Sequence, residues 1–85
     1  MNEYIAVFKS LSYAGRVKND IIYPKRPELI KTPGSIAGGC SYSLTFPKQQ
    51  LEYVKKAIER HRKGFLGIYR KTINNRFEAV SYDIP

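Results

Sequence analysis

Hydrophobic and polar residues recur along this chain with periods that predict five strands. Residues 4–8 (Tyr-Ile-Ala-Val-Phe) are apolar throughout, as in a central strand covered on at least one face. Tyr42, Leu44 and Phe46 alternate with Ser and Thr, so one face of this strand belongs to a core and the other to solvent. The last two runs flank Asn74-Asn75, a pair that tolerates a tight hairpin turn. The predicted strands are residues 4–8, 28–32, 42–46, 65–73 and 76–82.

Two other stretches carry apolar residues at spacings of three and four, which predicts amphipathic helices. The first runs from Ser12 to about residue 22, with a buried stripe of Ala14, Val17 and Ile21. The second follows Pro47, a residue suited to a first helical position, and Gly64 stands where a C-terminal cap is expected. Its buried stripe consists of Leu51, Val54, Ala57 and Ile58.

The order strand, helix, strand, strand, helix, strand, strand predicts an α+β fold. It matches a ferredoxin-like sandwich (βαββαβ) with an extra C-terminal edge strand and two helices on one face of an antiparallel sheet. The expected strand order is 5-4-1-3-2. The length of 85 residues gives room for one domain, residues 1–85.

Charge and composition indicate which partners and which cellular compartment to expect for this domain. Fifteen Lys and Arg against seven Asp and Glu give a formal net charge of +8, which attracts acidic proteins or nucleic acid. The N-terminal residues lack the pattern of a signal peptide, and no run of eighteen apolar residues occurs, so we expect a cytoplasmic protein without a membrane segment. The single cysteine excludes an internal disulfide.

That cysteine, Cys40, is the main candidate for chemistry. It follows Gly38 and Gly39 and precedes Ser41, in a loop that opens at Pro33 and Gly34; these five neighbours are expected to shape the loop and present the thiol at a turn. The alternative is a small buried hydrophobe without a reactive role.

Topology predicts what surrounds this loop. A right-handed crossover places it at the end of the sheet where the first strand enters the first helix, and the second helix finishes beside it. Arg60, His61, Arg62 and Lys63 would then form a basic docking patch near the thiol. Cations and a helix N-terminus lower the pKa of a cysteine, so we predict a lowered pKa for Cys40. Alternatively, these residues are a solvated helix end, with His61 on the surface.

Several other chemistries are excluded by what the sequence lacks. One cysteine and one histidine with scattered acidic residues do not supply a usual zinc site, and no phosphate-binding loop ending in Gly-Lys-Ser or Gly-Lys-Thr occurs. A Cys-His hydrolase would need an oxyanion site that so small a domain hardly provides. The sequence favours a non-catalytic carrier or binding protein, with no metal and no cofactor.

The residues resemble a known family. Four features look like the putative selenium/sulfur carrier-like family of small bacterial proteins. They are the strand Ile5-Ala6-Val7-Phe8, the proline ahead of a small-residue stretch that ends in cysteine, the segment Leu51-Glu52-Tyr53-Val54-Lys55-Lys56, and the segment Gly67-Ile68-Tyr69. The resemblance covers about residues 4–70, with matches at Pro33 and Cys40. The family has serines before its cysteine and a glycine after it, unlike this chain. It implies that Cys40 accepts sulfur or selenium as a persulfide, from a sulfur donor protein.

Two alternatives use no thiol chemistry. In an RNA-binding module, bases would stack on aromatic residues of the sheet, but the alternation of residues 42–46 places those aromatics in the core. Nucleic-acid binding would therefore be weak and electrostatic. In a homodimer, the open face of the sheet would be the interface, because strands one and four carry apolar residues on both of their faces. Leu66 and Ile68 are expected on the same face of strand four.

Overall fold

The computed structural model of this chain describes residues 3–22, 25–36, 41–74 and 76–80. It contains every predicted helix and strand: the strands at residues 4–8 and 42–46 have the predicted bounds, and the other elements differ by one to a few residues at those ends that the structure describes. The elements are β1 (Tyr4–Phe8), α1 (Leu11–Asp20), β2 (Glu28–Lys31), β3 (Tyr42–Phe46), a 3₁₀ turn η1 (Lys48–Gln50), α2 (Leu51–Arg60), β4 (Phe65–Lys71) and β5 (Phe77–Val80). The 3₁₀ turn follows Pro47, so the regular α-helix begins only at Leu51.

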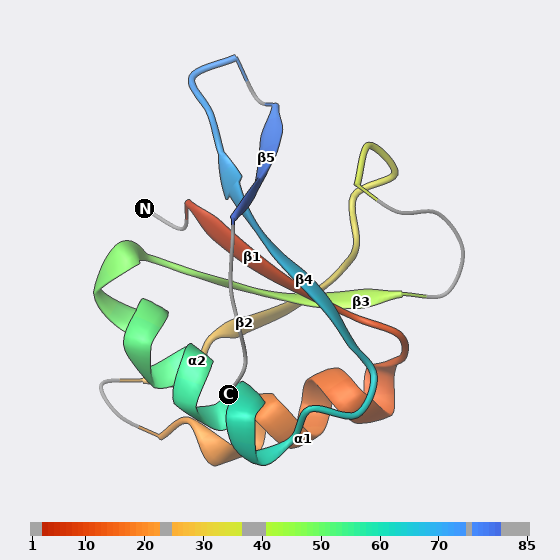
Figure 1. Cartoon of the computed structure of the whole chain (residues 1–85), viewed down its shortest axis with the longest axis vertical. Helices are drawn as coiled ribbons and strands as arrows, with labels where there is room; N and C mark the ends of the chain where they lie inside the picture. The colour runs from red at the N-terminus through yellow and green to blue at the C-terminus, as the bar shows by residue number, and fades with distance from the viewer. Residues whose placement is uncertain (1–2, 23–24, 37–40, 75, 81–85) are drawn as a thin grey trace.

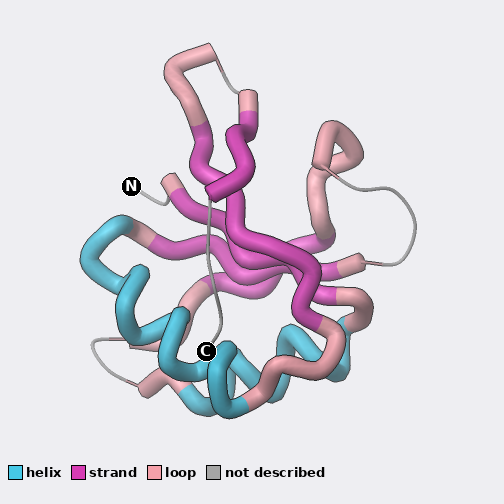
Figure 2. Tube along the Cα trace, in the orientation of Figure 1, coloured by secondary structure: helices cyan, strands magenta, loops and turns pink. Residues whose placement is uncertain are grey.

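The strands form one antiparallel sheet in the order β2-β3-β1-β4-β5, which gives each strand the neighbours that the sequence predicts. Both helices cover the same face of this sheet (Figure 1). The tube view separates the two layers, with the strands crossing above the helices (Figure 2). The protein is therefore a small α+β domain with two helices packed on a five-stranded antiparallel sheet.

The hydrophobic core lies between the helices and the sheet. Alternate residues of β1, β3 and β4 meet the two predicted helical stripes there, and burial of each large side chain contributes about 1.5–3 kcal/mol. Tyr4 stacks on Phe46 with ring centroids 6.0 Å apart. The buried core residues are Tyr4, Ala6, Phe8, Ala14, Val17, Ile21, Leu44, Phe46, Val54, Ala57, Ile58 and Ile68. This confirms that the aromatic residues of β3 face the core.

The opposite face of the sheet is also covered at its centre. Ile5 and Val7 are only 3% and 1% exposed, although they point away from the core. Ser43 beside them is fully buried, and its hydroxyl lies 2.6 Å from that of Thr32. The prediction of a solvated face is wrong at Ser43, because its hydroxyl is paired with that of Thr32, which is itself buried. The second apolar face of β1 therefore does not form the exposed surface expected for a dimer.

A β-bulge changes which residues of β4 face the core. The pairing between β1 and β4 shifts between Val7 and Phe8, so Phe8 lies opposite Phe65 instead of Leu66. The rings of Phe8 and Phe65 are 5.8 Å apart, and Leu66 is 55% exposed. Because a bulge adds one residue to one strand, it reverses the alternation after it. The expectation that Leu66 and Ile68 share a face is therefore wrong.

The turn between α2 and β4 also differs from the prediction. The helix ends at Arg60, where the backbone N–H of His61 donates to the carbonyls of Ala57 and Ile58. Gly64 lies beyond this end, at φ +82°, in the turn that leads into β4. The Tyr13 ring occupies the space that a Cβ at Gly64 would need. Gly64 is therefore not the helix cap but the residue that lets the turn pass close to α1.

Candidate functional site

The loop between β2 and β3 holds the predicted thiol. Gly38, Gly39 and Cys40 lie outside the described residues. On the β2 side the chain makes a turn in which the N–H of Ile36 donates to the carbonyl of Pro33 at 3.0 Å. Gly34 within this turn is exposed and has open space around it. Pro33 thus closes a turn at the start of the loop, and no neighbouring atom requires the residue at position 34 to lack a side chain.

Ser41 marks where the loop returns to the sheet. Its carbonyl accepts a hydrogen bond from the N–H of Thr32 at 3.2 Å, which ties the two ends of the loop together. The residue is 7% exposed, and its buried hydroxyl has no hydrogen-bond partner within residues 3–22, 25–36, 41–74 and 76–80. A buried hydroxyl without a partner is costly, so this group is a candidate donor to a neighbouring atom of the site.

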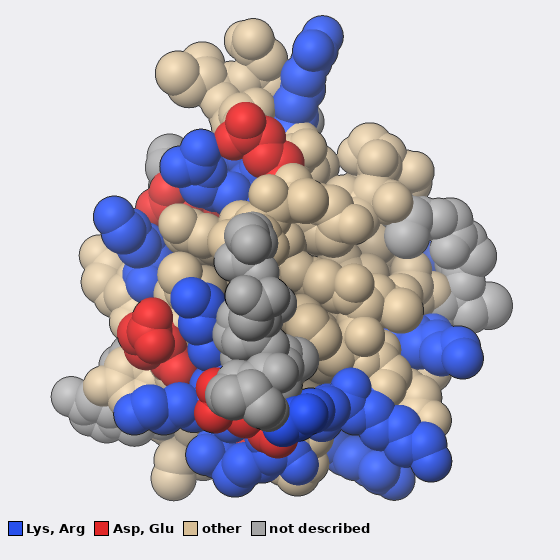
Figure 3. All heavy atoms as spheres, in the orientation of Figure 1, with Lys and Arg blue, Asp and Glu red and all other residues tan. Residues whose placement is uncertain are grey.

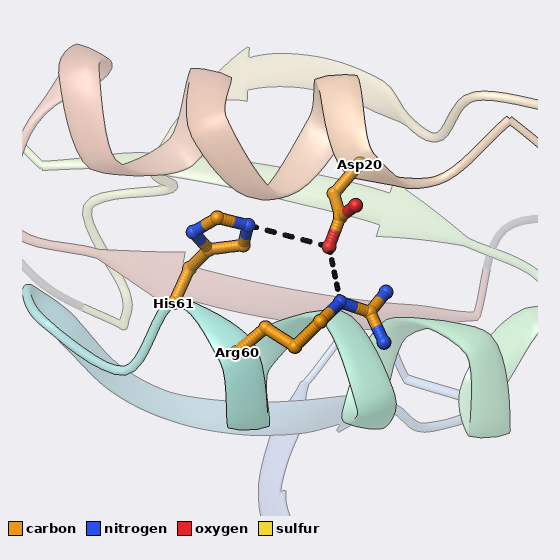
Figure 4. Close-up of polar contacts among 3 residues, drawn as sticks. All are labelled: Asp20, Arg60 and His61. Atoms are coloured by element: carbon orange, nitrogen blue, oxygen red, sulfur yellow. Dashed lines mark hydrogen bonds and ion pairs between the residues drawn. The ribbon is translucent and has the colours of Figure 1, made fainter.

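The predicted basic residues lie at the end of α2, where two of them contact α1. Asp20, at the end of α1, accepts a hydrogen bond from Nε of Arg60 at 2.7 Å, and its same oxygen lies 3.3 Å from Nε2 of His61 (Figure 4). All three side chains are partly exposed. Asp20 therefore offsets part of the positive charge of this segment and joins the C-terminal ends of both helices.

The same segment forms a cleft with α1. Its volume is about 180 Å³, and it is lined by Tyr13, Arg16, Arg60, His61, Arg62 and Lys63. In Figure 3, Lys and Arg gather along the lower part of the molecule, over the helices. We call these six residues the basic cleft. The structure thus brings together all four residues predicted as a docking patch.

Sequence reasoning missed the α1 side of this cleft. Tyr13, Arg16 and Asp20 were not among the predicted site residues. Their spacing of three and four residues does place them on one helix face. That signal was available, but it does not indicate which other element the face meets, because only the packing of α1 beside α2 decides this.

The basic residues 60–63 and the start of β3 lie at the same end of the sheet. The N–H of Lys9 donates to the carbonyl of Gly64 at 2.7 Å, so the residue after Lys63 lies beside the end of β1. Phe8, the last residue of β1, is paired with Tyr42, the first residue of β3. Arg62 and Lys63 therefore approach the end of the sheet where the β2–β3 loop returns. That Cys40 lies near them stays a prediction.

Over the described part of the chain, no group of three or more His, Cys, Asp or Glu side chains is placed to hold a metal ion. None of the helices in that part is long and apolar enough to cross a membrane.

Comparison with known proteins supplies the family. No curated protein and no solved structure matches the chain. A family model described as "Putative Se/S carrier protein-like" matches residues 3–70. The match extends from β1 through α1, the cysteine loop and α2 to Arg70 in β4, and it leaves β5 outside. The chain belongs to this Se/S carrier protein-like family.

Proposed function

We propose that this protein carries sulfur or selenium on Cys40, as a persulfide-type adduct. The family match carries this proposal, since it includes the loop that holds the cysteine. Cys40 is the only thiol in the sequence, so a carrier role that uses a thiol has no other residue available. The carrier would act in the cytoplasm without being an enzyme itself, on a scaffold that we interpret as ferredoxin-like.

The transfer that we propose is a thiol exchange. The Cys40 thiolate attacks the terminal sulfur of a donor persulfide, R–S–SH, and forms a new S–S bond. The original S–S bond of the donor breaks, and R–S⁻ leaves with the electron pair. The products are Cys40–S–SH and the donor thiolate, so no external oxidant or reductant is needed. Delivery to an acceptor thiolate repeats the same step, and selenium takes the place of the terminal sulfur in the selenium case.

Neighbouring groups support the nucleophile and its partners in this proposal. The unpartnered hydroxyl of Ser41, the residue next in the chain, is available as a hydrogen-bond donor to the sulfur anion. Cations of the basic cleft lower the pKa of a nearby thiol and attract a donor or acceptor protein with an acidic surface. The hydrogen bond from the N–H of Thr32 to the carbonyl of Ser41 ties together the two ends of the loop that holds the cysteine.

Mass spectrometry of the intact protein tests this function. The full chain is incubated with glutathione persulfide, separated from the reagent and measured before and after treatment with dithiothreitol. We expect the addition of one sulfur atom, its removal by the reductant, and its transfer to a second thiol in the absence of reductant. The Cys40→Ser variant is the control and should gain no sulfur.

A second variant separates the role of Ser41 from that of the thiol alone. Ser41→Ala keeps the size of the side chain close to that of serine but removes its donor. We expect the adduct to form more slowly than in the natural sequence, and to be lost faster. A native chain that forms no adduct on Cys40 under these conditions would contradict the carrier function.

A further inference from the structure

A cavity lies on the face of the sheet away from the helices. The β4–β5 hairpin and the turn after β2 both extend on this side of the sheet, opposite the helical layer (Figure 1). The cavity has a volume of about 220 Å³, and four of its lining residues are apolar and come from four segments: Ile5, Ile30, Pro33 and Phe77. Ile5 is only 3% exposed, whereas the other three are partly exposed. The cavity therefore offers apolar surface that a ligand can still reach.

Two opposite charges border the same cavity. Glu3, just before β1, and Lys71, the last residue of β4, also line it. The N–H of Lys71 donates to the carbonyl of Glu3 at 2.7 Å, which holds the two residues beside each other. In the described part of the chain, no ion pair joins their side chains. A carboxylate and an ammonium group thus stand at one apolar cavity without pairing with each other.

The cation next to Lys71 in the sequence is bound elsewhere. The Arg70 guanidinium donates to the carboxylate of Glu78 at 2.9 Å. The charge of Glu3 also raises the pKa of Arg70, but Glu78 has the larger effect through its hydrogen bond and its charge. A ligand that contacts Glu3 would therefore displace no ion pair among the residues that the structure describes.

We propose that this cavity binds a free α-amino acid with an apolar side chain, such as leucine. Its ammonium group contacts Glu3, its carboxylate contacts Lys71, and its side chain packs on the apolar lining. The volume corresponds to about seven water molecules at about 30 Å³ each, which suits a molecule of this size. Because hydrogen bonds between charged groups are about twice as strong as neutral ones, a ligand that carries both charges is favoured over one that carries either alone.

This site goes beyond the carrier function and does not use the thiol. Its two charges come from the start of β1 and the end of β4, and only Pro33 belongs to the cysteine loop. Lys71 and Phe77 lie beyond residue 70, where the family match ends, so membership of the family does not imply this site. A Cys40→Ser protein is expected to bind leucine as the natural chain does, whether or not the natural chain carries sulfur.

A nuclear magnetic resonance titration of the ¹⁵N-labelled full-length protein with leucine tests the site. We expect saturable amide shifts concentrated at residues 3–5, 30, 71 and 77. Isoamylamine lacks the carboxylate of leucine, and isocaproate lacks its ammonium group. Each should bind about tenfold more weakly than leucine, because one charged group of the cavity is left without a partner. Glycine should also bind more weakly, because it has no apolar side chain to bury.

Variants of the two charged residues assign each part of the ligand to its partner. Lys71→Gln should bind leucine no more tightly than isoamylamine, because the carboxylate of leucine then has no cation to contact. Glu3→Gln should likewise lose the preference for leucine over isocaproate. Lys48→Gln and Glu59→Gln are the matched controls, because they remove the same charges at exposed positions that do not line the cavity. Both controls should keep the two preferences.

Several outcomes would overturn the proposal. The natural chain could show no saturable shift at these residues up to the solubility limit of leucine, or it could bind the two single-charge analogues as tightly as leucine. Equally tight binding of neutral N-acetyl-leucine amide would show an apolar groove without a zwitterion site. Shifts at the same residues that depend on protein concentration without any ligand would show that a second copy of the chain occupies the cavity. Should a variant not fold, the analogue series on the natural chain gives the decision.

Discussion

A pair of hydroxyls illustrates how single residues hold the sheet beside the cysteine loop. Thr32 and Ser43 lie at 8% and 0% exposure, and their oxygens are 2.6 Å apart. Each hydroxyl therefore has the other as its hydrogen-bond partner at a buried position. Their bond fixes the segment after β2 to β3, next to the backbone bond between Thr32 and Ser41.

Removing both of these hydroxyls should cost clearly less stability than the sum of the two single removals. Thr32→Val or Ser43→Ala leaves a buried hydroxyl without its partner, and we expect each to lower the free energy of unfolding by about 1–2 kcal/mol. The double variant should lose clearly less than the sum of the two. Urea denaturation of all four proteins measures this coupling, and strict additivity would contradict it.

Two glycines should respond in opposite ways to the same substitution. Gly64→Ala forces a side chain into positive φ and into the Tyr13 ring, so we expect a loss of about 2 kcal/mol or more. Gly15 lies within α1 with open space around it, so Gly15→Ala should raise stability by about 0.5–1 kcal/mol. The urea midpoint of each variant checks its sign. A destabilised Gly15→Ala protein would show that the open space is not the deciding factor.

At the scale of elements, ion pairs join segments that are distant in sequence. Asp20 joins the ends of α1 and α2, whereas Arg70 of β4 and Glu78 of β5 form a bond of 2.9 Å across the terminal hairpin. The hydrogen bond and the charge of Glu78 raise the pKa of Arg70. Both pairs are exposed to solvent, which limits what they contribute to stability.

The contact between the helix ends should be worth little in stability. Asp20 is 30% exposed and Arg60 is 56% exposed, so we expect Asp20→Asn to lower the free energy of unfolding by about 0.5–1 kcal/mol, and by less in high salt. Glu52→Gln is the matched control, because its pair with Lys55 is 3.8 Å long and more exposed on the Glu52 side. Thermal unfolding at low and high salt distinguishes the two, and a loss above about 3 kcal/mol would indicate a buried role for Asp20.

At the scale of the whole molecule, the net charge of +8 should act on any reagent that approaches Cys40. Iodoacetate and iodoacetamide differ mainly in charge. Relative to free cysteine, we expect iodoacetate to react faster with the protein than iodoacetamide does, because the positive field concentrates the anion. The difference should decrease as salt is raised, since the screening length falls to about 8 Å at physiological ionic strength.

The same reaction, followed against pH with the neutral reagent, measures the pKa of the thiol. The proposed carrier function, and the prediction that the basic residues 60–63 lie near Cys40, lead us to expect a midpoint below the ordinary cysteine value of about 8.5. Alkylation with a midpoint at or above that value, or no alkylation of the folded protein, would contradict the predicted activation. Equal relative rates for the two reagents at low salt would contradict the role of the overall charge.

The sequence by itself determined the elements and the side of the sheet that they bury. Strict alternation in residues 42–46 and the helical stripes on α1 and α2 follow from chemistry that acts over a few residues, so they can be seen without coordinates. The sequence also identified Cys40 as the only candidate thiol and the basic residues 60–63 at the end of α2. It supplied no signal for the bulge at Phe8, because a shift in pairing depends on how two strands meet.

Only the tertiary structure decided which distant residues share a site. Tyr13 and Arg16 join Arg62 and Lys63 in one cleft because α1 packs beside α2. Gly64, expected at a helix end, is needed instead where a turn passes the Tyr13 ring. Ser43 is polar in a position that its alternation marks as solvated, but it is fully buried and its hydroxyl is paired with that of Thr32, from another segment. Periodicity records the preference of a segment for one face, whereas contacts between segments depend on the arrangement of the complete chain.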